Sequence, residues 1–286
     1  MARSLSPTVR RRRLARVLRG LRASAGLTLD SAAKQAAIPR ATLGKLETGD
    51  LKRIRLADLD SLAQLYEVDN QRRLGMHQLA KDAIEQGWWS KYKDVFGAEA
   101  LPDFEAEASF IRTYEAQVIP GLLQTPAYTR AVFTGTNAFA EEEVKRHVDA
   151  RMERQRILTH AYPPEYAAII DEAALRRPAG GIQAMQEQLH HLTDVARHPH
   201  ITLHVLPFSA GMHAANLGGF MIMDFPEPAD PAIGYAETPS SILFVETEEE
   251  IRRHDAMWRE ALNASLTVAQ SIDFINEVAT SLESYQ

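Results

Sequence analysis

Apolar residues in the first 80 positions recur at helical spacing in five separate stretches. In the first stretch, about residues 9–25, Leu14, Val17, Leu18 and Leu21 fall at i, i+3, i+4 and i+7 and form one apolar stripe. Four further helices are expected at about 28–36, 39–48, 56–66 and 71–84, and the last of them would use Leu74, Leu79, Ala83 and Ile84 as its apolar face. This pattern predicts an all-α domain of five short helices.

Turn residues mark the ends of these helices. Gly26 and Gly49 follow the first and third helices, where a left-handed backbone favours glycine. Thr28 can cap the second helix, and Pro39 suits the first turn of the third. Only Ala37-Ile38 then separates helices two and three. Two helices joined by so tight a turn indicate a helix-turn-helix unit.

The pattern changes after about residue 84. Residues 104–160 are expected to be helical, and strands and helices mix after Pro163-Pro164. The strands are expected at 166–170, 201–206, 220–225, 233–236 and 242–245, and the helices at 181–197, 248–261 and 266–282. The predicted fold is an all-α five-helix helix-turn-helix domain (residues 1–84) followed by a larger α+β domain (residues 85–286).

Charge divides the chain in the same way. Residues 1–80 contain 16 Lys and Arg against 7 Asp and Glu, a balance of +9 within a chain of net charge −6. The remainder has 16 against 31, a balance of −15. A basic module that meets a polyanion, beside an acidic module that does not, is the simplest interpretation. We therefore expect double-stranded DNA to bind on the N-terminal side alone.

Composition narrows the class of protein further. The chain has no cysteine, which excludes disulfides and thiolate metal sites. Its longest apolar runs are far shorter than a membrane span, and the basic N-terminus lacks an apolar signal core. The Arg-rich residues 1–25 could alternatively be a transit peptide, but the fold needs Leu14–Leu21 as its first helix. We expect a cytoplasmic, nucleoid-associated protein with no membrane partner and no cofactor.

The start of the third helix carries the polar residues that could read DNA. Arg40 can pair bidentately with guanine and Lys45 can donate as a point charge, with Thr42 between them. A solvated helix face is the alternative interpretation. Phosphate contacts are expected from the basic residues on either side: Arg10, Arg13, Lys52 and Arg53.

The stretch GLTLDSAAKQAAIPRATLGKLETG (residues 26–49) resembles the repressor family typified by phage 434 repressor and the xenobiotic-response-element regulators. The match includes Gly26–Thr28, Leu43, Leu46, Glu47 and Gly49. The resemblance implies that certain residues face base edges, namely Arg40, Ala41 and Lys45, and that others bind phosphate or orient the helix, namely Thr28 and Thr42.

Two positions depart from that family. Leu29 stands where glutamine is common, and Gly44 stands where a larger residue is usual. Glycine inside a helix lowers stability by ~1 kcal/mol relative to alanine. No operator sequence can therefore be deduced. Glu47 would repel DNA unless it points inward to an arginine, so we expect a structural role for it.

Several sequence segments of the second domain resemble the C-terminal domain of WhiJ-like actinobacterial regulators. They include VIPGLLQTPAYTRAVF, RMERQRIL and IIDEAALRRPAGGIQAMQEQL. That resemblance implies sensing or partner binding, often of a small companion protein in an antitoxin-like arrangement. Polar and aromatic residues within or near these segments are candidates for an effector site: Arg112, Tyr114, Gln124, His213, Asn216 and Glu237. Helix capping and loop hydrogen bonding are the alternative roles. Trp88-Trp89 is expected to be a packing anchor between the domains.

No catalytic motif is present in the sequence, so we expect no enzyme. His190, Asp194 and His198 lie four apart on one helix, but a solvated face explains them better than a metal site. The favoured hypothesis is a homodimeric transcription regulator on an inverted repeat, responding to a small molecule or companion protein. The alternative is an antitoxin-like protein that sequesters a small partner and autoregulates its operon.

Overall fold

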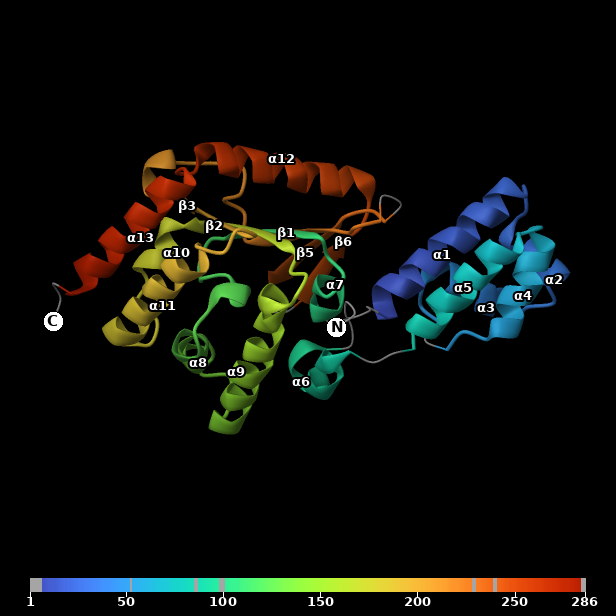
Figure 1. Ribbon diagram of the computed structural model, residues 1–286, viewed down its shortest axis with the longest axis horizontal. Coiled ribbons are helices and arrows are strands. Elements are labelled where there is room, and N and C mark those ends of the chain that lie inside the picture. The colour runs from blue at the N-terminus through green and yellow to red at the C-terminus, as the bar shows by residue number, and fades with distance from the viewer. Residues whose placement is uncertain are drawn as a thin grey trace. The chain divides into compact units, whose positions relative to one another are not determined.

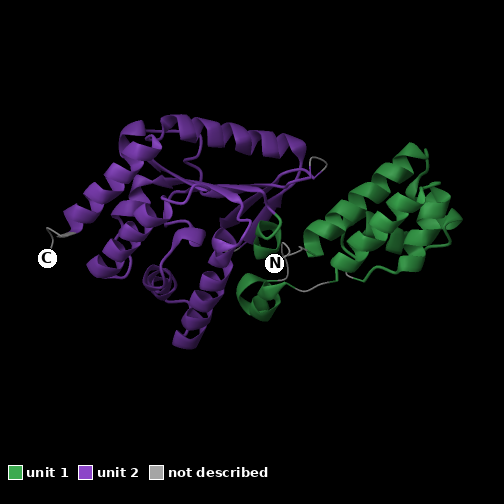
Figure 2. Ribbon diagram, in the orientation of Figure 1, with its two compact units in different colours: residues 1–107 green, residues 108–286 purple. Residues whose placement is uncertain are grey.

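The computed structural model describes residues 7–51, 53–84, 87–97, 101–227, 230–238 and 241–283. The chain forms two compact units, residues 1–107 and 108–286 (Figure 2). The domain boundary was expected between residues 84 and 85. Residues 85–86 lie outside the described residues. That boundary stays a prediction.

The first unit begins with the five helices that the sequence predicts (Figure 1). They are α1 Pro7–Ser24, α2 Leu29–Gln35, α3 Arg40–Thr48, α4 Leu56–Leu65 and α5 Asn70–Asp82. Thr28 caps α2, since its side-chain oxygen accepts a hydrogen bond from the Ser31 amide at 3.1 Å. Gly49 ends α3 in the left-handed conformation, with φ 80°. The end signals at Thr28 and Gly49 are thus confirmed.

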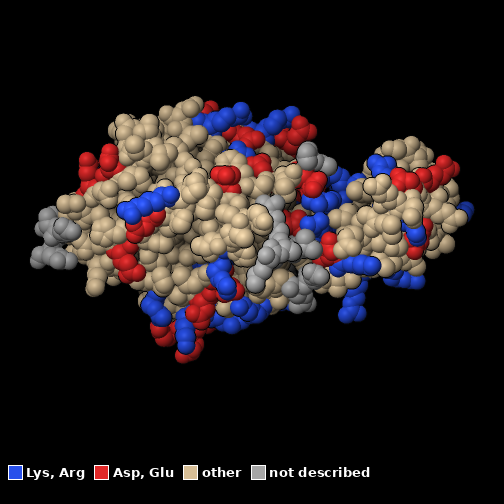
Figure 3. Space-filling model, viewed as in Figure 1, with Lys and Arg blue, Asp and Glu red and all other residues tan. Residues whose placement is uncertain are grey.

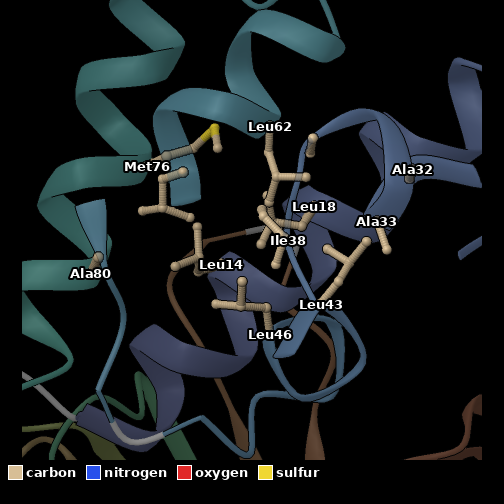
Figure 4. Packing of buried hydrophobic residues seen from close by; sticks show 12 residues of the cluster. Leu14, Leu18, Ala32, Ala33, Ile38, Leu43, Leu46, Leu62, Met76 and Ala80 are labelled. Carbon is tan, nitrogen blue, oxygen red and sulfur yellow. The ribbon is translucent and has the colours of Figure 1, made fainter. Parts of the chain in front are cut away.

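The five helices enclose one apolar core (Figure 4). The leucine stripe of α1 meets Leu43 and Leu46 of α3 there. The expectation for α5 was wrong at two positions, since Leu74 and Ile84 are 54% and 58% exposed. The buried apolar positions are Met76, Ala80 and the expected Ala83, which repeat at i, i+4 and i+7.

The rest of the first unit is a short aromatic and acidic segment. It comprises η1 Trp88–Tyr92, α6 Lys93–Phe96 and α7 Leu101–Glu105. Trp88 makes edge contacts with Trp89 and with Phe96, at ring-centroid distances of 6.0 and 5.8 Å. The two tryptophans therefore anchor a cluster within this unit, and their role between domains stays a prediction.

The second unit is built on a mixed six-stranded sheet of order β3-β2-β1-β4-β5-β6. Strands β1–β3 are parallel, and β4, β5 and β6 continue the sheet antiparallel. The strands are β1 Phe110–Glu115, β2 Glu165–Asp171, β3 Ile201–Leu206, β4 Phe220–Asp224, β5 Ile233–Thr238 and β6 Ser241–Val245. The five strands expected from β2 to β6 are confirmed.

Strand β1 was missed, because residues 104–160 were expected to be helical apart from a loop at 119–121 and a break at 134–137. Its apolar residues Phe110, Ile111 and Tyr114 also fit a helical spacing, so the local pattern does not separate the two states. Hydrogen bonding to neighbouring strands makes this segment a strand: β1 lies between β2 and β4 and bonds to both. A central strand buried on two faces lacks the alternation that marks a strand in sequence.

Helices cover both faces of the sheet (Figure 1). On one face lies α12 (Glu248–Ala264), where Trp258 packs with Tyr114 of β1 and Ile222 of β4. In Figure 3, basic and acidic side chains alternate along α12.

The helices are α8 Pro126–Gly135, α9 Glu141–Gln155, α10 Glu172–Arg176, α11 Gly181–Val195, α12 Glu248–Ala264 and α13 Val268–Glu283. Among the described residues, no helix is long and apolar enough to cross a membrane. The predicted fold class is confirmed.

Candidate nucleic-acid interface

The turn between α2 and α3 sets the position of the recognition helix. Ala37 adopts a left-handed conformation, with φ 54°, and reverses the chain. Ile38 then places its side chain in the core, and its amide bonds to the Ala33 carbonyl at 3.0 Å. Because both ends of the turn are fixed by burial, α3 is held at a defined angle to α2.

A partly buried ion pair attaches α3 to α1. Arg22 donates from Nε to Oε1 of Glu47 at 2.8 Å and from Nη2 to Oε2 at 2.9 Å. Its Nη1 donates to the Leu27 carbonyl at 2.9 Å. The hydrogen bond to Glu47 raises the pKa of the Arg22 guanidinium. The expectation that Glu47 points inward to an arginine is therefore confirmed.

The opposite face of α3 is open to solvent. Arg40, Ala41 and Lys45 are exposed, and Thr42 is half-buried. Arg40 forms an ion pair through its Nε with Asp30 of α2. Thr28 is also exposed on this side, with its hydroxyl already engaged as the cap of α2. The predicted base-reading residues are thus presented together, while their contacts with DNA stay a proposal.

The two departures from the repressor pattern adjoin each other. A methyl group at position 44 would lie 3.8 Å from Cδ2 of Leu29, an ordinary van der Waals distance. Leu29 is partly buried against the apolar core. The side chain at position 29 therefore turns inward beside Gly44, where the related family has a polar glutamine.

The predicted phosphate contacts have different surroundings. Arg53 is exposed, and Lys52 lies outside the described residues. Arg10 bonds to Glu107 at 2.8 Å, and Arg13 approaches the same carboxylate at 3.9 Å. The side chains of Arg10 and Arg13 are only 19% and 18% exposed. Their phosphate contacts stay predictions, but the structure gives both arginines a carboxylate partner.

The fold and this face define a helix-turn-helix protein of the DNA-binding regulator type. Comparison with family sequences agrees: residues 13–76 match the family described as "Helix-turn-helix domain". Residues 98–277 match the family described as "Domain of unknown function (DUF5753)", which spans more than half of the chain. The protein therefore belongs to the DUF5753 family and carries an N-terminal helix-turn-helix domain. No curated protein matches the chain.

In the second unit, the structure brings three candidate effector residues together. The ring of His213 lies edge-on to Tyr114 at 5.7 Å, and its amide donates to Oδ1 of Asn216 at 3.3 Å. The Tyr114 hydroxyl contacts Asp171 at 3.4 Å, and burial raises the pKa of Tyr114. Nδ1 of His213 is buried without a hydrogen-bond partner among the described residues. A ligand could use that nitrogen.

The other three candidates lie elsewhere in the second unit. Arg112 is held by Asp224 and Asp255 at 2.8 and 2.6 Å. Gln124 is fully buried, and donates to the Ile119 carbonyl at 2.7 Å. Glu237 is exposed on β5 and accepts a bond from the Tyr235 hydroxyl. Arg112 and Gln124 thus make the internal contacts that the alternative interpretation expects, and all three remain untested as ligand contacts.

Two titratable residues were missed by the sequence analysis. Asp30 was not selected because nothing in its local pattern shows that it reaches Arg40. Glu115 ends β1, and burial raises its pKa to about 7, while Arg151 and Arg154 act in the opposite direction. His190, Asp194 and His198 are exposed, and within the described ranges no three His, Asp or Glu residues gather as a metal site.

Proposed function

We propose that the protein is a sequence-specific transcription regulator that binds an inverted repeat as a homodimer. The observation that carries the proposal is the two-sided construction of α3. Leu43 and Leu46 bury one side in the core, while Arg40 and Lys45 stand exposed on the other. A fixed helix with a polar outer face is the element that enters the major groove.

Base reading and affinity would come from different residues. One bidentate Arg–guanine pair discriminates by ~1–3 kcal/mol against a wrong base. Arg53 lies exposed just after α3, where it would contact phosphate. Phosphate contacts of this kind supply affinity that falls with salt. Two half-sites one DNA turn apart, ~34 Å, require two recognition helices and hence a dimer.

The second unit is proposed to receive the signal. Support comes from the Tyr114–His213 contact, where a buried imidazole nitrogen lacks a partner among the described residues. An effector, either a small molecule or a companion protein, would shift DNA binding only through its different affinities for two states of the dimer. The resemblance to WhiJ-like regulators agrees with this division of labour.

A second candidate function is sequestration of a small partner, as in an antitoxin. The acidic balance of the chain after residue 80 favours a basic partner. Three apolar side chains in the loop between β3 and β4 are also exposed: Phe208, Met212 and Leu217. Affinity capture with the full chain, compared with a Met212→Asp, Leu217→Asp variant, tests this candidate. Equal recovery of small proteins by both chains would count against it.

Genomic footprinting tests the first function. The wild type is compared with an Arg40→Ala, Lys45→Ala variant and with an Arg72→Ala, Lys81→Ala control, which removes two exposed cations from α5. Discrete sites, arranged as inverted repeats, should disappear with the α3 variant and persist with the control. Diffuse binding that both double variants weaken equally would show electrostatic attraction without sequence reading.

A further inference from the structure

The exposed ion pair between α2 and α3 stands at the centre of the proposed reading surface. Oδ1 of Asp30 accepts a hydrogen bond from Nε of Arg40. The side chains remain 71% and 67% exposed, respectively. Asp30 lies in the first turn of α2, and Arg40 is the first residue of α3. The pair therefore bridges the two helices of the helix-turn-helix at their N-terminal ends.

The atom that Asp30 engages determines what Arg40 can still do. An arginine pairs with guanine through two parallel N–H groups, directed at O6 and N7. Because the carboxylate occupies Nε, the edge of the guanidinium that carries Nη1 and Nη2 points away from it. That edge has the geometry of the guanine pair. Among the described residues, the Arg40 side chain forms no hydrogen bond other than the one to Asp30.

Stability does not explain the pair. Ion pairs this exposed contribute little to folding, because water competes for both charges. The carboxylate also carries a cost at a DNA-binding face, since it repels phosphate. Leu29, the residue before Asp30, turns toward the core and offers no polar group to Arg40. In this chain, Asp30 is the residue of α2 that contacts the arginine.

We infer that Asp30 is a positioning residue, which aims Arg40 at the O6 and N7 atoms of one guanine in each half-site. This inference rests on the proposed function. A flexible arginine beside DNA has two competing targets, base edges and phosphates. Asp30 restrains the side chain before binding, so less freedom is lost in the guanine contact. Its negative charge also opposes movement of Arg40 to a phosphate.

Selection from a random-sequence pool of duplex DNA provides the first test. Full-length wild type should recover sites with a guanine at one position of each half-site. Arg40→Ala should lose the preference at that position alone. Asp30→Asn, which keeps the shape and removes the charge, should lower the discrimination at that position about tenfold, within the range of one bidentate pair.

Binding to non-cognate duplex DNA at several salt concentrations provides the second readout. In Asp30→Asn, Arg40 is released toward phosphates, so the slope of log K against log salt should steepen by about 0.9. The double variant Asp30→Asn, Arg40→Ala should lack that increment. Asp50→Asn is the matched control: it removes an equal charge after α3, from a carboxylate that bonds to Thr48. It should leave the guanine preference intact.

Different failures have different signatures. If Asp30→Asn and Asp50→Asn change affinity for all sequences by the same factor, Asp30 acts only by repulsion and the inference is wrong. If Asp30→Asn binds the selected guanine sites more tightly with undiminished discrimination, Asp30 masks Arg40 rather than aiming it. If the wild type selects no sequence, the proposed function itself fails.

Discussion

Arg22 and Glu47, 25 residues apart in the sequence, form a two-point ion pair that joins α1 to α3. The carboxylate is 4% exposed, so it has lost nearly all of its hydration. Two parallel hydrogen bonds replace that water, and they fix the direction of α3 as well as its distance from α1. This ion pair, whose carboxylate is buried, therefore sets the orientation of α3 and with it the direction of the exposed reading surface.

Removal of Arg22 should be costly. Arg22→Ala leaves the Glu47 carboxylate buried without its main partner, and should lower the free energy of unfolding by about 2–4 kcal/mol. Glu47→Gln retains hydrogen-bonding capacity and should cost about half as much. Urea denaturation followed by circular dichroism measures both. Equal and small losses would show that water replaces the pair.

The glycine inside α3 should be replaceable. Among the described residues, the nearest neighbour of a methyl group at position 44 is Leu29, at 3.8 Å, and alanine is the better helix former. Gly44→Ala should therefore raise the free energy of unfolding by about 0.5–1 kcal/mol. Gly49→Ala is the control, because φ at that position is 80°. It should destabilise by about 1–2 kcal/mol, and similar shifts of both midpoints would contradict this account.

Glu115 should make stability depend on pH. Its pKa rises from an ordinary 4.5 to about 7 in the folded state, so the folded chain binds the proton more tightly than the unfolded chain. Stability should then fall as pH rises from about 4.5 to 7, by about 1–3 kcal/mol in total. Glu115→Gln should remove this slope, whereas Glu260→Gln on the exposed side of α12 should keep it. Denaturation midpoints between pH 4.5 and 8 give the comparison.

Arg10 and Arg53 should differ in their effect on DNA binding. Arg53 is exposed, so Arg53→Ala should reduce the salt slope of binding by about 0.9. Arg10 is held by Glu107, so Arg10→Ala should leave that slope unchanged and lower stability by about 1–2 kcal/mol. Fluorescence anisotropy across a salt series separates the two. A reduced salt slope for Arg10→Ala would contradict this prediction and show that Arg10 contacts phosphate.

Much of the first unit could be predicted because its signals are local. Thr28, Pro39 and Gly49 mark helix ends through the chemistry of one or two residues, and the α1 stripe follows from helical spacing. The inward direction of Glu47 followed from electrostatics alone. Even here, Leu74 was misplaced, because several registers of an apolar face fit a helix of 13 residues, and Ile84 was misplaced because α5 ends before it.

The candidate effector site was less predictable. Tyr114 and His213 are brought together by strand pairing across nearly 100 residues of sequence, with β1 bonded to β4. Gln124 resembled a ligand-binding residue in the sequence. In the structure it is buried among backbone and side-chain partners, including Arg151 at 2.7 Å. Polar residue type alone does not distinguish a ligand contact from an internal hydrogen bond.

The sequence by itself determined the five helices, the basic N-terminal module and the identity of the residues on the outer face of α3, because helical periodicity, end signals and charge act over a few residues. The tertiary structure decided which residues meet. It placed β1 at the centre of the sheet, turned Arg10 toward Glu107, and joined Asp30 to Arg40. Such contacts depend on packing between distant segments, and no local pattern encodes them.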